Sequence, residues 1–257
     1  MLRKLFYNDF YAIKRYALPR LVAAFGCSAC AFFILLLDAV LPSSGDIAVF
    51  LDNILTSFLI ALLFAVIILL LLSAIHIFVS YYQSFFADEG YLTFMIPATR
   101  EQLLISKLLA GSAWGLILLF SAFAAIAVGG ILPVELLMRA ENASFLSALI
   151  RDLSDYISVL GVFDLFLSLI AQVILIDTAI TLGSLLAKRK LLGSLLFVCL
   201  LSGGLLLLRT LLSLLFHAIT DSGELFTSLL SLLLSLAAGV GGYLISRTLL
   251  NHKLNLV

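Results

Sequence analysis

The sequence predicts an all-α integral membrane protein with six transmembrane helices, and three observations lead to this fold class. The chain of 257 residues is 63% hydrophobic and only 12% charged, whereas soluble domains carry about 25% charged residues. It contains six apolar runs long enough for a helix to cross a bilayer, which takes about 20 residues. The runs lack the alternation of barrel strands, and a helix satisfies its own backbone groups in lipid.

The six runs are expected to form a single transmembrane domain over residues 1–257. Several are longer than the minimum, so we expect helices that tilt or extend beyond the membrane surface. The predicted spans cover residues 18–41, 54–82, 103–132, 156–187, 191–217 and 225–250.

Lysine and arginine residues predict the orientation, because cytoplasmic loops carry an excess of both. With both termini in the cytoplasm, most of these bases fall inside. Those inside are Arg3, Lys4, Lys14, Arg15, Arg20, Arg100, Lys107, Lys188, Arg189, Lys190, Arg247 and Lys253, and those outside are Arg139, Arg151 and Arg209. We therefore predict a multi-pass protein with both termini cytoplasmic.

Residues 1–17 form a polar segment before the first span and favour an amphipathic helix lying in the membrane surface. At helical spacing one side is apolar, and it carries Leu2, Leu5, Phe6, Phe10, Ile13 and Ala17. Lys4, Lys14 and Arg15 group opposite, where anionic lipid headgroups would attract them. Asp9 falls on the apolar side and does not fit this pattern. The alternative is a disordered basic tail.

Several classes of function are disfavoured by the sequence. A net charge of +0 argues against a nucleic-acid partner, because such proteins concentrate basic residues on one face. The chain has no GxxxxGK[ST], HExxH or GxSxG motif, so it offers no nucleotide, zinc or hydrolase site of those kinds. Asp164 and Asp177 lie thirteen residues apart, about 140° around a helix, and cannot form an acid–base pair there. We expect no catalytic residues, cofactor or metal in this chain.

We single out four of the polar residues within the predicted spans, where a charge is costly. Asp164 and Arg209 lie near the outer ends of their spans, so they either face each other or extend separately to the surface. Asp177 lies deeper, and Thr181 and Ser184 continue its stripe, which must turn away from lipid. Asp177 could pair with His76 inside the bundle, the arrangement we favour, or line a pathway for substrate.

Small residues recur at helical spacing in two spans, where helix backbones can approach closely. One group is Gly111-xxx-Gly115 in the third span, and the other contains Ser235, Ala238, Gly239 and Gly242 in the sixth. We expect them to pack helices within one subunit; a seam between two subunits is the alternative.

The stretch from Phe85 to Lys107 is the long polar interruption in the first half of the chain, and it faces the cytoplasm in the predicted topology. Pro97 ends any preceding helix, and Thr99-Arg-Glu-Gln102 matches a capping box that starts the next one. Asp88 and Glu89 lie among aromatic residues, a composition that favours a buried contact. The alternative is an aromatic anchor at the membrane surface with incidental acids.

The segment EGYLTFMIPATREQLLISKLLAGSAW, Glu89–Trp114, resembles the second cytoplasmic loop and third span of bacterial ABC transporter permeases of the type-two exporter class. That family shows an acidic-Gly pair, a short apolar run, Pro, a small polar-basic cluster and then Leu-Leu-x-x-Lys. The segments KRKLLGSLL and LLNHKLNLV are also similar to one group of these permeases from Gram-positive bacteria.

The resemblance implies that residues 82–96 contain a cytoplasmic coupling helix, which docks on a separate ABC ATPase subunit. The residues it assigns to this coupling are Asp88, Glu89, Gly90, Tyr91 and Arg100. It further implies that ATP binds to the partner subunit, that a second permease copy or a homologous permease completes a dimer, and that an amphipathic substrate crosses the bacterial plasma membrane.

Two other classes remain open at this point. An ion-gradient-driven secondary transporter would show broken helices and charged residues at the middle of the membrane. A non-transporting membrane sensor or assembly factor would show no dependence on a nucleotide.

Overall fold

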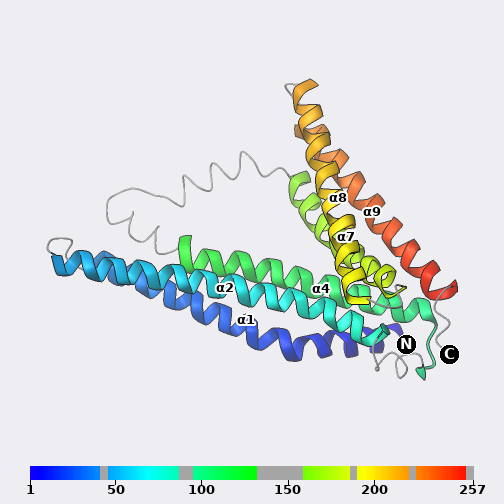
Figure 1. Cartoon of the computed structure of the whole chain (residues 1–257), viewed down its shortest axis with the longest axis horizontal. Helices are drawn as coiled ribbons and strands as arrows, with labels where there is room; N and C mark the ends of the chain where they lie inside the picture. The colour runs from blue at the N-terminus through cyan, green and yellow to red at the C-terminus, as the bar shows by residue number, and fades with distance from the viewer. Residues whose placement is uncertain (41–45, 87–94, 132–158, 186–189, 220–223, 253–257) are drawn as a thin grey trace. The chain divides into compact units, whose positions relative to one another are not determined.

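Long helices make up the fold. The structure is a computed structural model that describes residues 1–40, 46–86, 95–131, 159–185, 190–219 and 224–252 (Figure 1). The helices in these ranges are α1 (Leu2–Val40), α2 (Asp46–Phe86), α4 (Arg100–Ile126), the π-helix η1 (Ala127–Ile131), α7 (Val159–Ser184), α8 (Lys190–Ile219) and α9 (Glu224–His252).

Six helices in these ranges are each long and apolar enough to cross a membrane. The predicted all-α fold with six spans is therefore confirmed, and the chain is a multi-pass membrane protein. The main difference lies at the N-terminus, where the helix predicted for residues 1–17 and the span predicted for 18–41 form one helix. Pro19 lies inside it and removes one backbone hydrogen bond, which membrane helices tolerate.

Residue contacts divide the chain into two compact units. Unit 1 comprises Met1–Ile13, Ile77–Leu116 and Ile157–Val257, and unit 2 comprises Lys14–His76 and Ile117–Tyr156. The units are described separately below. The single domain expected over residues 1–257 stays a prediction.

In unit 1, one hydrophobic cluster joins the ends of several helices. Tyr81 and Phe85 from the end of α2 pack with Leu104 from the start of α4, Ile180 from α7 and Leu250 from the end of α9. A residue near the start of α1, Leu5, packs against the same cluster. The start of α1 and the end of α9 therefore lie at one end of the unit, as an even number of spans requires. Their cytoplasmic placement stays a prediction.

Small residues bring α4 and α9 close to α7 in unit 1. A Cβ added at Gly115 would lie 3.0 Å from a methyl group of Leu169, and one at Gly111 would lie 3.4 Å from Val173. On α9, a Cβ at Gly242 would lie 2.9 Å from the hydroxyl of Thr178. The small residues at these positions pack helices within one subunit, as predicted.

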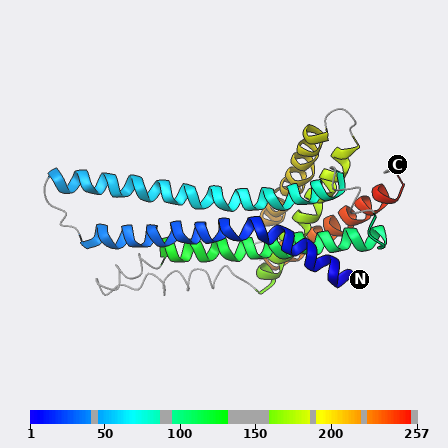
Figure 2. The ribbon, with the colours of Figure 1, turned by 90° about the horizontal axis from the view of Figure 1, so that it is seen from below.

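In unit 2, segments of α1, α2 and α4 run side by side (Figures 1 and 2). Ala24, Val66 and Ala125 form the buried contact among them. The hydroxyl of Ser28 on α1 donates a hydrogen bond to the carbonyl of Ala125, close to the point where α4 becomes the π-helix η1. Gly129 in η1 has no side chain and leaves room for Ser28. A polar residue of one span thus stabilises an irregular turn of another.

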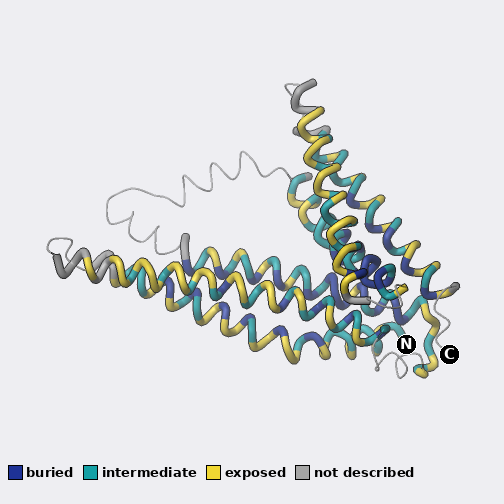
Figure 3. Tube along the Cα trace, viewed as in Figure 1, coloured by how far each residue is buried: buried dark blue, intermediate teal, exposed yellow. Residues whose placement is uncertain are grey.

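Exposed positions recur along the helices (Figure 3), and large apolar residues occupy many of them. Most residues of the apolar part of α8, Leu192–Leu215, are exposed or half-buried, and Leu207 and Leu214 are 65% and 68% exposed. Such surfaces are unfavourable in water over so wide an area. They suit a hydrocarbon solvent, which agrees with the membrane assignment.

Replacing Gly183 by alanine should lower folded yield and thermal stability. A Cβ at this position of α7 would overlap the backbone of Ser194 on α8, and overpacking of this kind costs about 1–3 kcal/mol. Gly204→Ala is the matched control, because a Cβ there meets no atom within 4 Å. Thermal unfolding of both variants in detergent checks this expectation, and equal melting temperatures would contradict it.

Candidate functional site

Of the residues expected to couple to an ATPase, the structure describes Arg100 at the start of α4. Asp88, Glu89, Gly90 and Tyr91 fall outside the described residues, and Arg100 is the first residue of α4. The predicted capping box is present. The backbone N–H of Gln102 donates to the hydroxyl oxygen of Thr99 at 3.3 Å, and the N–H of Thr99 donates to the side-chain oxygen of Gln102 at 3.4 Å. Thr99 therefore fixes the point at which the helix begins.

The first turn of α4 is bound to the end of α9. The guanidinium of Arg100 donates to the carbonyl of Leu250 at 2.9 Å, one of the carbonyls that a helix end leaves without an intrahelical partner. The next residue, Glu101, forms an ion pair with Arg247 on α9. Two adjacent residues of α4 thus hold the last turns of α9.

The apolar side of the N-terminal segment packs against α4. The rings of Phe10 and Trp114 are stacked with centroids 5.0 Å apart, and the indole N–H of Trp114 donates to the carbonyl of Phe10 at 3.0 Å. The structure thus makes this segment helical rather than a disordered tail, and part of its apolar side faces protein. Its position in the membrane surface stays a prediction.

Asp9, which did not fit the apolar side of that helix, binds to α4. Its carboxylate accepts a hydrogen bond from the hydroxyl of Ser106 at 2.7 Å and forms a 2.9 Å ion pair with Lys107. Because Ser106 and Lys107 are consecutive residues of α4, one carboxylate fixes both the position and the rotation of the first helix. The misplaced acid was the sequence signal for this contact, but its partner could not be identified from the sequence.

Asp177 is buried deep in unit 1, with only 2% of its surface exposed. Thr181, one turn further on α7, is fully buried. Its hydroxyl oxygen lies 3.2 Å from that of Tyr81 on α2, and the two groups share a hydrogen bond. The polar stripe predicted on this helix therefore turns away from lipid at both positions. One carboxylate oxygen of Asp177, Oδ1, has no hydrogen-bond partner.

A small cavity adjoins Asp177. It has a volume of about 20 Å³, and its lining includes the polar side chains of Asp9, Ser80, Tyr81, Ser84, Lys107 and Asp177. These residues come from α1, α2, α4 and α7, so the cavity lies where four helices of unit 1 meet. Polar side chains at this junction are held by one another, since hydrocarbon offers them no partners.

His76, the partner that we favoured for Asp177, belongs to unit 2. Its ring lies 4.6 Å from that of Tyr16, centroid to centroid. In the same unit, Arg20 donates to the carbonyl of Leu72, one turn before His76, at 2.9 Å. The pairing of His76 with Asp177 stays a prediction.

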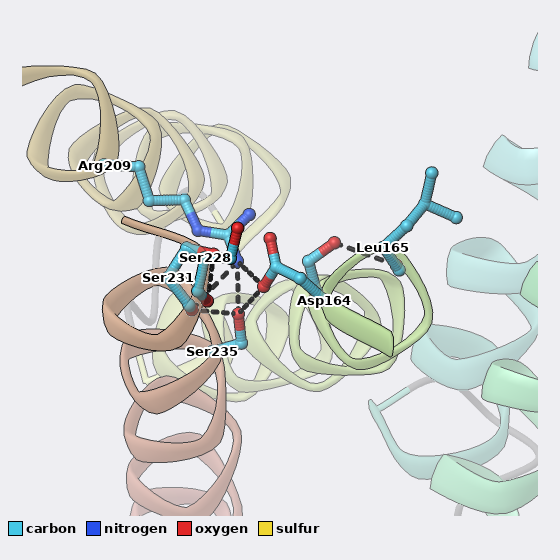
Figure 4. Close-up of polar contacts among 7 residues, drawn as sticks. Asp164, Leu165, Arg209, Ser228, Ser231 and Ser235 are labelled. Carbon is cyan, nitrogen blue, oxygen red and sulfur yellow. Dashed lines mark hydrogen bonds and ion pairs between the residues drawn. The ribbon is translucent and has the colours of Figure 1, made fainter. Parts of the chain in front are cut away.

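Asp164 and Arg209 face each other, as one of the two expected arrangements requires (Figure 4). The guanidinium of Arg209 on α8 lies 3.1 Å from a carboxylate oxygen of Asp164 on α7. It also donates to the carbonyl of Ser231 on α9 at 3.2 Å and to the hydroxyl of Ser235. The side chains of the pair are only 20% and 21% exposed, so three helices share the solvation of one charge pair.

An apolar groove of about 340 Å³ runs between α4, α7 and α9 within unit 1. Its volume falls in the range of small-molecule sites, about 300–1,000 Å³. Its lining includes the polar side chains of Ser112, Ser235 and Tyr243, and of these Ser235 contacts the Asp164–Arg209 pair. Ser235 therefore belongs to both the groove and the ion-pair network.

Within the described residues, no group of three or more His, Cys, Asp or Glu side chains could hold a metal ion. Comparisons with protein-family models, with curated proteins and with solved structures give no match for this chain. The functional assignment therefore rests on the residues and contacts described above.

Replacing Phe10 by alanine should shift the fluorescence of Trp114 to longer wavelength and lower stability. Trp114 is the single tryptophan of the chain, so its emission reports on the contact between α1 and α4. A Phe→Ala substitution lowers the free energy of unfolding by about 3–5 kcal/mol at a fully buried site. We expect a smaller decrease here because Phe10 is half-buried. Tyr7→Ala, at an exposed position of α1, is the control. An unchanged emission in the Phe10 variant would contradict the stacked contact.

Removing one member of the Asp164–Arg209 pair should destabilise the protein more than removing both. Asp164→Leu leaves the Arg209 guanidinium without its carboxylate partner. Arg209→Leu leaves the Asp164 carboxylate without its guanidinium partner. Breaking a fully buried pair costs about 3–5 kcal/mol, whereas replacing both members by apolar residues is often neutral. Because the Asp164 and Arg209 side chains are partly exposed, each single variant should lose less stability than this. The double variant should still melt at a higher temperature than each single variant. A double variant that melts below both singles would show that the pair itself stabilises the fold.

Proposed function

We propose that this chain is the membrane-spanning permease subunit of an ATP-driven ABC exporter, and that a separate subunit binds and hydrolyses ATP. The observation that carries the proposal is the segment Glu89–Trp114, whose sequence resembles the coupling loop and third span of such permeases. The capping box and the anchored first turn of α4 lie within this segment. The proposed coupling residue Arg100 is therefore part of a firmly held helix, which follows the other four in the sequence.

The contacts around α4 support a mechanical role for the segment before it. Arg100 and Glu101 hold the end of α9, and Lys107, about two turns further, holds Asp9 of α1. A force applied by an ATPase to residues 82–96 would therefore act on α4 together with α1 and α9. Helices that are bonded to one another in this way can transmit a displacement, because packed elements move together.

The proposed substrate is amphipathic, such as a peptide, an antibiotic or a lipid. The groove between α4, α7 and α9 is almost wholly apolar and ends beside the partly exposed Asp164–Arg209 pair. A ligand with an apolar portion and a polar group would find both kinds of surface there. Two copies of the chain, or this chain with a homologous permease, would enclose the pathway between them in the bacterial plasma membrane.

The alternative is a secondary transporter driven by an ion gradient. The unpartnered carboxylate oxygen of Asp177 favours it, because ionisable residues inside a membrane often belong to ion or proton pathways. The two functions differ in their energy source. ATP-driven export continues when the ion gradients are collapsed by ionophores and stops when the ATPase subunit is lost.

Reversing the charge of Asp88 and Glu89 should uncouple the permease from its ATPase. Removing a charged member of a partly desolvated interface costs about 2–5 kcal/mol, so Asp88→Lys with Glu89→Lys should reduce copurification of an ATPase with the tagged chain from its native host. Transport-linked ATP hydrolysis should fall with it.

Asp152→Lys with Asp155→Lys supplies the control, because it makes the same charge change in a loop predicted to lie outside. It should leave the ATPase bound. If no ATPase copurifies even with the unaltered chain, and ionophores abolish transport, the ABC assignment fails and the secondary transporter is favoured.

A further inference from the structure

The hydrogen bonds around the small cavity in unit 1 leave a donor and an acceptor unused. The ammonium group of Lys107 has three N–H donors. Among the described residues, the hydrogen-bond acceptor that it meets is the Asp9 oxygen at 2.9 Å. The other oxygen of Asp9 accepts from Ser106. Asp9 is therefore satisfied through both oxygens, while Lys107 keeps donor capacity on the side of the cavity that it lines.

Asp177 supplies the unused acceptor, because its Oδ1 is buried and has no partner. The hydroxyl groups of Thr181, Tyr81 and Ser84 are already committed. Thr181 donates to the backbone carbonyl of Asp177 at 2.8 Å, so in the contact between Thr181 and Tyr81 the tyrosine must donate. Ser84 donates to the backbone carbonyl of Tyr81 at 3.1 Å. None of these protons is free for the Asp177 carboxylate.

No direct ion pair joins Lys107 to Asp177, although both line the cavity and both are among the described residues. A buried carboxylate oxygen without a donor costs about 1–3 kcal/mol or more, which a folded protein normally avoids. The cavity volume of about 20 Å³ exceeds the roughly 10–15 Å³ that one water molecule needs, and the site offers the two to four polar partners that such a water requires.

We propose that one water molecule occupies this cavity, accepts a hydrogen bond from the Lys107 ammonium and donates one to the Asp177 carboxylate. Its second proton can reach a hydroxyl oxygen of Ser80 or Ser84, both of which line the site. Lys107 then serves two carboxylates, Asp9 directly and Asp177 through the water. The water thereby ties α7 to the contact between α1 and α4, and the Tyr81–Thr181 hydrogen bond adds α2.

The site does not depend on the proposed exporter function, because it follows from unsatisfied groups and volume alone. The cluster holds two carboxylates and one ammonium, so a monovalent cation is the competing occupant. A cation would have to lie beside the Lys107 ammonium, which repels it. A neutral water avoids this repulsion and meets the donor on one side and the acceptor on the other.

A double-mutant cycle on the full-length chain, purified in detergent, tests the link between Lys107 and Asp177. The variants are Lys107→Met, Asp177→Leu and the two combined, each followed by thermal unfolding. If the water joins the two residues, the combined loss in melting temperature should be smaller than the sum of the single losses by roughly 2–4 °C or more. Additive losses would overturn the proposal.

Two further variants keep the test interpretable. Asp177→Asn preserves a hydrogen-bonding group of the same size, so it should lose less stability than Asp177→Leu and remain measurable if the leucine variant does not fold. Lys107→Met combined with Asp164→Leu is the matched control. Asp164 lies thirteen residues from Asp177 on α7, about 20 Å along the helix, so this second pair should be additive.

The occupant itself is identified in two ways. An experimental structure should show one density peak within about 2.6–3.2 Å of both the Lys107 nitrogen and an Asp177 oxygen. The melting temperature should be the same in sodium chloride and in choline chloride at equal ionic strength. An empty cavity, a direct Lys107–Asp177 ion pair or a melting temperature raised specifically by sodium would each overturn the assignment to water.

Discussion

Hydrocarbon supplies no hydrogen-bond partners, and this constraint bears on where the polar groups of the described membrane-spanning helices lie. Several polar side chains in each unit turn toward other helices and find partners there. Asp9 meets Ser106 and Lys107, and Asp164 meets Arg209. Apolar side chains occupy the remaining helix surface and face outward, where lipid accepts them. Polar contacts and close approaches at small residues therefore add to the packing of the buried apolar clusters, because burying leucine against leucine gains little in lipid.

Helix α7 is the element on which both kinds of contact converge in unit 1. Glycines of α4 and α9 approach its side chains closely, and Gly183 of α7 admits the backbone of α8. The same helix carries Asp164 near one end and Asp177 nearer the other. Close approach and charge pairing depend on each other. A polar side chain reaches its partner on the next helix because small residues have brought the backbones together.

The start of α4 combines a fixed helix boundary with contacts to two other helices. Thr99 and Gln102 cap the helix, Arg100 and Glu101 bind α9, and Trp114 stacks on Phe10. Caps of this kind satisfy the free backbone groups at a helix start. A helix boundary fixed in this way is useful where a loop must deliver a force, which is the role proposed for the segment before it. The buried cluster around Lys107 lies on the same helix, about two turns further along.

The sequence by itself determined the solvent of the protein, the number of spans and the cap at Thr99. These depend on composition and on residues close together in the chain, where local periodicity and capping chemistry are sufficient. It also indicated which residues were anomalous, namely Asp9, Asp164, Asp177 and Arg209, because a charge on an apolar face needs an explanation. The sequence did not identify the partner of every one of these residues. One pair, Asp164 and Arg209, could be proposed because both lie near the same end of their spans.

Only the tertiary structure decided that Asp9 binds Lys107, that Arg100 and Glu101 hold α9, and that Tyr81 reaches Thr181. These residues lie between about 100 and 150 positions apart in the chain, and nothing in a helical repeat says which face of one span meets which face of another. That choice is made when six helices pack together. Small residues set how closely the helices approach, and the requirement that no polar group be left alone in lipid selects their rotation.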